Sequence, residues 1–227
     1  TNEGSTKPPA RCRMKNRFLG LVYVILFSLL VITAITQYAE KGTLVIWMSL
    51  ALGALYLLPA MLERLLDIII PPLLKYVILA FLFLCLHVGG IMSFYERFNG
   101  WDSFIHLISG CLTPALALSM INILNRNPMF LKNLSPGFIF VFMFLFAAGA
   151  SLIWEYLELF SDSLFGTNHL NDTILDNGQV DIGLIDTMTD LLFSQSASLL
   201  TSFCLYRAIK KDRWLSISRI LITREEK

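Results

Sequence analysis

The sequence predicts an all-α protein, a polytopic membrane bundle of about six transmembrane helices with both termini in the cytoplasm. Apolar residues make up 56% of the 227 residues, charged residues make up only 15%, and the mean hydropathy is +0.65. The apolar residues gather in six runs of about 20 residues, the length that crosses a bilayer as a helix. The basic residues gather in alternate connections between these runs, as they do in membrane proteins. A soluble domain of this length would carry more charge.

The first run, residues 18–36, follows a basic segment and so has the outline of a signal peptide. It is longer than the apolar core of a signal peptide, about 7 to 15 residues, and no small-residue cleavage site follows it. We therefore predict a retained helix. Residues 1–16 are rich in Lys, Arg and Pro without apolar periodicity, which predicts a disordered cytoplasmic tail.

The other five runs are separated by short connections. Pro71 and Pro72 follow the second run, and Pro128 and Pro136 lie between the fourth and the fifth. The predicted spans after the first are residues 43–61, 75–94, 103–124, 137–160 and 186–208. Because no connection is longer than residues 161–185, we predict one transmembrane domain, residues 17–210, followed by a basic cytoplasmic tail, residues 211–227.

Lys and Arg are divided unequally between the two sides of these spans. Of the 18 in the chain, only Lys41 and Arg97 lie in connections on one side, and the other 16 lie in the tails and in connections on the opposite side. Basic loops stay in the cytoplasm, so the tails are predicted to be cytoplasmic and residues 161–185 to lie outside. The expected partner is membrane lipid, and the net charge of +1 gives no support to nucleic-acid binding.

The four cysteines predict neither disulfides nor a zinc site. Cys12 lies in the N-terminal tail, whereas Cys85, Cys111 and Cys204 lie within predicted spans, and no CxxC pattern occurs. We expect them to be packing residues.

Three predicted spans carry acids, and one carries a histidine, at the end that we place outside. These residues are Asp102 and His106, then Glu155, Glu158 and Asp162, then Asp186 and Asp190. An ionised group at the centre of a bilayer costs about 2.5 to 3.5 kcal/mol, and less near the interface. Such a cluster therefore needs pairing, water or a cation.

The three groups are expected at one depth and on facing sides of their helices. At about 1.5 Å of rise per residue, His106 and Asp190 each lie about 6 Å inside the start of a span, and Glu155 lies about 7 Å before the end of one. Small hydroxyl residues continue each polar stripe inward, at positions that share one helix face. The stripe residues are Ser109, Gly110 and Thr113, then Ser151, then Ser194 and Ser198. We predict a water-filled pocket that opens outward.

Each residue also has a simpler explanation. Asp102 and Asp186 stand where helix N-caps belong. His106 can be an interior histidine that is simply hydrogen-bonded, and Asp162, at the end of a span, can be an acid in contact with water. Glu155 and Glu158 are harder to explain in this way. Two glutamates one turn apart cannot both stay ionised in a low-dielectric site unless they hold a cation or share a proton. The sequence therefore favours a metal or proton site.

If a metal binds, we expect its ligands to be His106, Glu155, Glu158 and Asp190. Asp102 and Asp186 would then orient ligands or act as a catalytic base. Carboxylates with one imidazole favour Mg, Mn, Ca, Fe or Zn, and exclude a thiolate site. Such an ion activates water for hydrolysis or holds a phosphate.

Three ordered motifs resemble those of the YjdF-like family of bacterial membrane proteins. WDSFIHLISG at residues 101–110 resembles that family's aromatic-Asp-xxx-His-xxx-Gly motif, and WEYLE at 154–158 and DTMTDL at 186–191 resemble its second and third motifs. The chain departs from the pattern at Ser196, where that family has glycine. VanZ-like membrane proteins share the Asp-xxx-His start and a later acidic helix. The resemblance implies a six-span protein of the bacterial plasma (inner) membrane and brings no established reaction.

The sequence leaves three functions open. The first is a metal-dependent hydrolase or transferase that acts on a lipid or cell-envelope substrate from the outer leaflet. The second is a cation- or proton-coupled transporter, although internal repeats and broken helices, which are frequent in transporters, are not evident. The third is a scaffold in which the polar stripes only specify how the helices pair.

Overall fold

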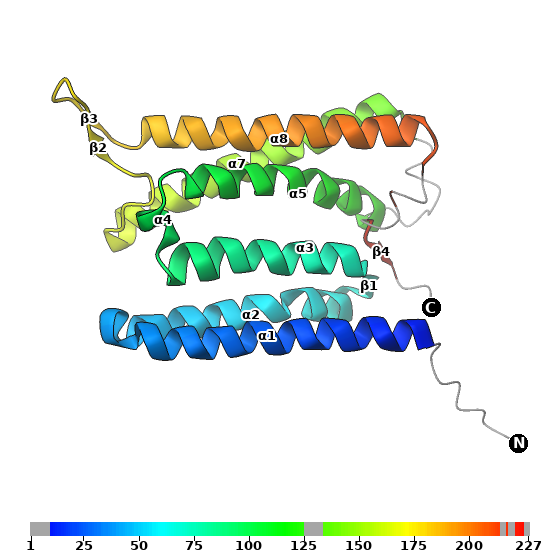
Figure 1. Cartoon of the computed structure of the whole chain (residues 1–227). Coiled ribbons are helices and arrows are strands. Elements are labelled where there is room, and N and C mark those ends of the chain that lie inside the picture. The colour runs from blue at the N-terminus through cyan, green and yellow to red at the C-terminus, as the bar shows by residue number, and fades with distance from the viewer. Residues whose placement is uncertain (1–9, 125–133, 214–216, 218–220, 225–227) are drawn as a thin grey trace, which may run out of the picture.

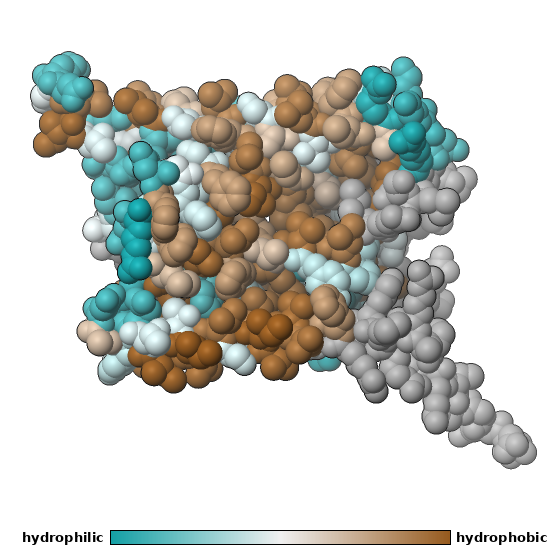
Figure 2. Space-filling model, in the orientation of Figure 1, coloured by the Kyte–Doolittle hydropathy of each residue, from teal (hydrophilic) through white to brown (hydrophobic). Residues whose placement is uncertain are grey.

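The computed structural model describes residues 10–124, 134–213, 217 and 221–224, and for residues 10–17, 165 and 224 only the backbone. Long helices lie side by side and alternate in direction, so the predicted all-α helical bundle is confirmed (Figure 1). Apolar side chains cover the middle of the bundle on the face shown in Figure 2, and polar ones gather at both ends. Residues 1–9 of the predicted N-terminal tail lie outside the described residues.

The helices extend beyond most of the predicted limits. They are α1 (Ala10–Lys41), α2 (Thr43–Leu66), α3 (Pro72–Leu82) with the π-helix η1 (Phe83–Ile91), α4 (Phe94–Arg97), α5 (Trp101–Leu124), α7 (Pro136–Phe165) and α8 (Leu184–Lys210). Among the described residues, five helical segments are long and apolar enough to cross a membrane. The sixth predicted span, α8, has 27 residues but does not reach that apolarity, since acids and hydroxyl residues lie along it.

The helices form two groups of three. In the first, α1, α2 and α3 with η1 pack around Val45, Leu52 and Tyr56. In the second, α5 and α7 pack around Leu118 and Met143, and α8 packs extensively against both helices. The second group contains all the acids of the candidate site.

A short C-terminal strand joins the two groups at one end of the bundle. Strand β4 (Thr223–Arg224) pairs antiparallel with β1 (Ile68–Ile69), which follows α2. Ile222 is buried against the start of α3 and the middle of α5. Its N–H group donates a hydrogen bond to Ser119 Oγ at 3.1 Å, and its carbonyl oxygen accepts one from Asn122 Nδ2 at 2.8 Å. Part of the predicted C-terminal tail therefore packs on the bundle.

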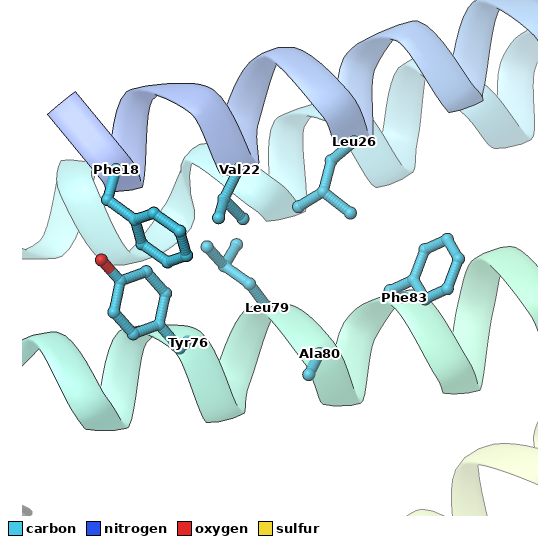
Figure 3. A pocket seen from close by; sticks show the side chains of 7 residues that line it. All are labelled: Phe18, Val22, Leu26, Tyr76, Leu79, Ala80 and Phe83. Atoms are coloured by element: carbon cyan, nitrogen blue, oxygen red, sulfur yellow. The ribbon is translucent and has the colours of Figure 1, made fainter.

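An apolar groove lies between α1 and α3 (Figure 3). Its lining residues are Phe18, Val22, Leu26, Tyr76, Leu79, Ala80 and Phe83. The rings of Phe18 and Tyr76 meet edge to face, 5.5 Å between centroids. Among the residues that line the groove, only Tyr76 has a polar group in its side chain. The groove therefore lacks the carboxylates and imidazoles that would bind a metal ion.

Candidate functional site

His106 and Asp102 lie one turn apart at the start of α5. The Asp102 Oδ1 atom is 3.5 Å from His106 Nε2, and the histidine side chain is only 4% exposed. Asp102 is the second residue of the helix, not the residue before it. The alternative explanation of Asp102 as the N-cap is therefore wrong, and its carboxylate lies beside the imidazole instead.

The α7 helix brings two glutamates to the imidazole. Glu155 is 4% exposed, and its Oε1 atom is 3.7 Å from His106 Nδ1. Glu158 lies one turn further on, and its Oε1 atom accepts a hydrogen bond from Trp154 Nε1 at 2.7 Å. The indole thus fixes one carboxylate oxygen of Glu158 and leaves the other free.

The α8 helix contributes Asp190, which is fully buried. Its Oδ1 atom accepts a hydrogen bond from Ser103 Oγ on α5 at 2.8 Å. Gly110 of α5, one turn after His106, touches the backbone of Ser194 of α8 where a side chain would have to fit. Because α5 and α8 run in the same direction, this contact sets His106 and Asp190 at the same level (Figure 1).

Asp186 has a different position from the one we predicted. The residue before α8 is Gly183, and Asp181 accepts hydrogen bonds from the N–H groups of Leu184 and Ile185. Asp181 therefore caps the helix, and the predicted N-cap role of Asp186 is wrong. Asp186 is also absent from the groups of close ligand atoms found among the described residues.

Asp162 lies at the end of α7 and organises the loop that follows. Its carboxylate accepts hydrogen bonds from the Thr167 hydroxyl at 2.6 Å and from the N–H groups of His169 and Leu170 at 2.8 and 2.9 Å. It is a structural acceptor for the loop that carries the hairpin of β2 (Thr173–Ile174) and β3 (Val180–Asp181).

The hydroxyl stripes do not require the water-filled pocket that we predicted. Each hydroxyl donates to a backbone carbonyl of its own helix. The pairs are Ser109 to His106, Thr113 to Ser109, Ser151 to Ala148, Ser194 to Leu191, and Ser198 to Gln195. These residues are small and internally bonded, so they serve close helix packing.

Two groups of possible metal ligands share His106. One consists of His106, Glu155 and Glu158, and the other of Asp102, His106 and Asp190, with one ligand atom of each residue within 4.8 Å of the others. All four predicted metal ligands and Asp102 thus come together, and Asp186 and Asp162 do not join them. Ser103 and Trp154, which hydrogen-bond to acids of the cluster, were not among the site residues predicted from the sequence. The i, i+4 spacing from Trp154 to Glu158 was a visible signal, but the contact from Ser103 to α8 had none.

Several atoms of this cluster are buried without a hydrogen-bond partner. They are His106 Nδ1, both carboxylate oxygens of Glu155, Glu158 Oε2 and Asp190 Oδ2. Leaving buried polar atoms unpaired is costly, and in proteins such atoms normally bind water or an ion. Four of the five belong to the group of His106, Glu155 and Glu158. This donor set fits a divalent ion, since it combines carboxylate oxygens with one imidazole nitrogen.

Comparison with known proteins identifies the family of this chain. The model of the family described as "Predicted membrane protein (DUF2238)" matches residues 18–211. The match covers most of the chain, which therefore belongs to this family. No curated protein and no solved structure matches it.

Proposed function

We propose that this member of the DUF2238 family of predicted membrane proteins binds a divalent metal ion between His106, Glu155 and Glu158, and is a hydrolase or transferase. The observation that carries the proposal is the set of four unpaired, buried donor atoms on these three side chains. Two of the three motifs that resemble those of YjdF-like proteins contain these ligands, which agrees with a common site.

The chemistry of imidazole assigns the two sides of His106 to different roles. A neutral imidazole has one nitrogen with a free lone pair and one that carries a proton, so it ligates one ion. The unpaired Oε1 atom of Glu155 lies 3.7 Å from Nδ1, which makes Nδ1 the ligand. The Nε2–H group then points at Asp102 Oδ1, 3.5 Å away, and this carboxylate orients the ring.

Asp190 is the acid that remains for proton transfer. Ser103 holds its Oδ1 atom, and its Oδ2 atom is buried and free. It lies beside His106 and Asp102, so its role as a metal ligand, expected from the sequence, gives way here to that of a proton acceptor.

Three protein donors leave room in the coordination of Mg, Mn, Ca, Fe or Zn for water and substrate. A bound divalent ion makes water more acidic and polarises a carbonyl or phosphoryl oxygen. The chain's own contribution is to hold three donors from two helices, to orient His106 through Asp102, and to accept a proton at Asp190.

The place of the cluster supports a substrate at the membrane surface. His106 and Asp190 lie within the first two turns of their helices, at the end that the charge distribution places outside. A lipid or a cell-envelope molecule in the outer leaflet of the bacterial inner membrane can reach this depth. Asp102 and Glu158, the members of the cluster that are only partly buried, would face its polar headgroup.

Elemental analysis of the purified protein tests the proposal. We expect the wild type to retain a divalent metal, Glu155→Gln to lose it, and Asp172→Asn in the outer loop to retain it. A wild type without metal that also fails to bind added divalent ions contradicts the metal site. If the protein binds metal, takes up ions in vesicles and does not turn over lipid or envelope substrates, the result favours the transport function instead.

A further inference from the structure

The first group of helices contains a second buried histidine, distant in sequence from the acidic cluster. His87 lies in the π-helix η1 and is 1% exposed. Its Nε2 atom forms a hydrogen bond with Thr33 Oγ1 of α1 at 2.9 Å, and its Nδ1 atom has no partner. A π-helical segment in a longer helix is rare and is frequent at functional sites.

The imidazole requires a partner whichever tautomer is present. If Nε2 carries the proton, Nδ1 is a buried acceptor without a donor, and if the Thr33 hydroxyl donates to Nε2, Nδ1 is a buried N–H without an acceptor. Either arrangement is costly in a membrane interior, where no bulk water reaches the group.

Two more buried polar atoms without partners lie on the neighbouring helices. They are Gln37 Oε1 on α1 and Ser49 Oγ on α2. Gln37 is one turn from Thr33 on the same face of α1. Ser49 follows Met48, whose Cε atom lies 3.8 Å from the position of a Cβ on Gly90. Both residues thus lie near the level of His87.

The polar side chains near His87 continue to one end of the bundle, where Lys41 lies. Its ammonium group, one turn beyond Gln37, donates to the carbonyls of Gly90 and Ile91 at 3.2 and 2.8 Å and to Ser93 Oγ at 2.7 Å. Lys41 is only partly buried, so polar groups lead from this end toward His87. Elements packed against η1 also carry Tyr56 on α2, Tyr76 on α3, Tyr95 on α4 and Asp102 on α5, and η1 itself carries Cys85.

We propose that Gln37, Ser49 and His87 bind internal water that enters beside Lys41, at a site separate from the one around His106. Water suits these three donors and acceptors, because it can donate to the Gln37 carbonyl and pair with His87 Nδ1 while the Ser49 hydroxyl completes its bonds. Buried waters typically make about three hydrogen bonds of this kind. The proposal does not depend on the metal site.

Deuterium exchange at the C2 position of histidine, measured for each residue by mass spectrometry, tests this hydration in the full-length protein. His169 in the outer loop is exposed and gives the reference for full access. We expect His87 to take up deuterium in the wild type and to lose that uptake in the double variant Gln37→Leu, Ser49→Ala. Wild-type His87 without uptake, or equal uptake in the wild type and the variant, overturns the proposal.

A stability measurement gives a second test if the double variant does not fold. Removing a dry, unpaired hydroxyl raises the melting temperature, whereas removing one that binds water does not. Ser28→Ala, on the exposed face of α1, corrects for the higher helix propensity of alanine. We expect Ser49→Ala to raise the melting temperature no more than Ser28→Ala does. A clearly larger rise shows a dry site and overturns the proposal.

Discussion

Gly110 of α5 contacts the backbone of Ser194 of α8 so closely that any side chain at position 110 overlaps it. One turn before this contact on each helix lie His106 and Asp190, the two most deeply placed members of the cluster on these helices. A small residue in one helix therefore fixes the level at which His106 of α5 and Asp190 of α8 meet.

Replacing Gly110 with alanine should separate α5 from α8. We expect Gly110→Ala to destabilise the protein by about 1 to 3 kcal/mol, as overpacking does, and to weaken metal binding because His106 shifts relative to α7 and α8. Thermal unfolding in detergent, with and without divalent ions, measures both effects. Gly149→Ala is the matched control, since a Cβ there meets no atom within 4 Å. Equal stability of the two variants would contradict the close crossing.

The ligands should act as one unit when a metal binds. A divalent ion at about 100 times its dissociation constant should stabilise the wild type by about 2.7 kcal/mol. His106→Gln, Glu155→Gln and Glu158→Gln should each lose most of this shift, and Asp176→Asn in the outer hairpin should keep it. A thermal shift series across divalent ions checks this, and full shifts in all three ligand variants would disprove the assignment.

Without metal, Glu158→Gln should be more stable than the wild type. Trp154 can donate to the amide oxygen as it does to the carboxylate, while one negative charge near Glu155 is removed. The expected result is a higher melting temperature of the metal-free variant together with the loss of metal-induced stabilisation. A lower melting temperature would indicate that the carboxylate is required for packing.

Asp102 should affect metal affinity less than the ligands do. Its carboxylate lies 3.5 Å from His106 Nε2, on the side of the ring away from Nδ1, so it would orient the ring without touching the ion, and such partners are worth about 10- to 100-fold in affinity. Asp102→Asn should therefore still bind metal, at higher concentration, whereas Glu155→Gln should not. Titration with a divalent ion distinguishes the two, and a complete loss in Asp102→Asn would make Asp102 a ligand.

The membrane orientation can be checked with single cysteines in a background without the native ones. Since 16 of the 18 Lys and Arg lie on one side, Asn171→Cys should react with an impermeant reagent from outside and Lys211→Cys should not. The reverse labelling would place the acidic cluster at the cytoplasmic surface and exclude an outer-leaflet substrate.

The sequence alone determined the helical bundle, the segments that form it and the acids that converge. Hydrophobic runs and helical spacing are local properties, so they fix which residues share a helix face and how far along the helix each lies. For this reason Asp102, His106, Glu155, Glu158 and Asp190 were found together. The predicted helices were shorter than the observed ones because polar residues continue a helix beyond its apolar run, as Lys41 does in α1.

The tertiary structure decided how the helices are turned toward one another and which atoms meet. It placed Glu155 at Nδ1 of His106, brought Ser103 to Asp190, and attached β4 to β1. These contacts join segments up to about 150 residues apart along the chain, and the energy of each depends on close packing between helices. No local pattern of residues encodes such a contact, because it exists only once neighbouring helices have fixed each other's rotation and level.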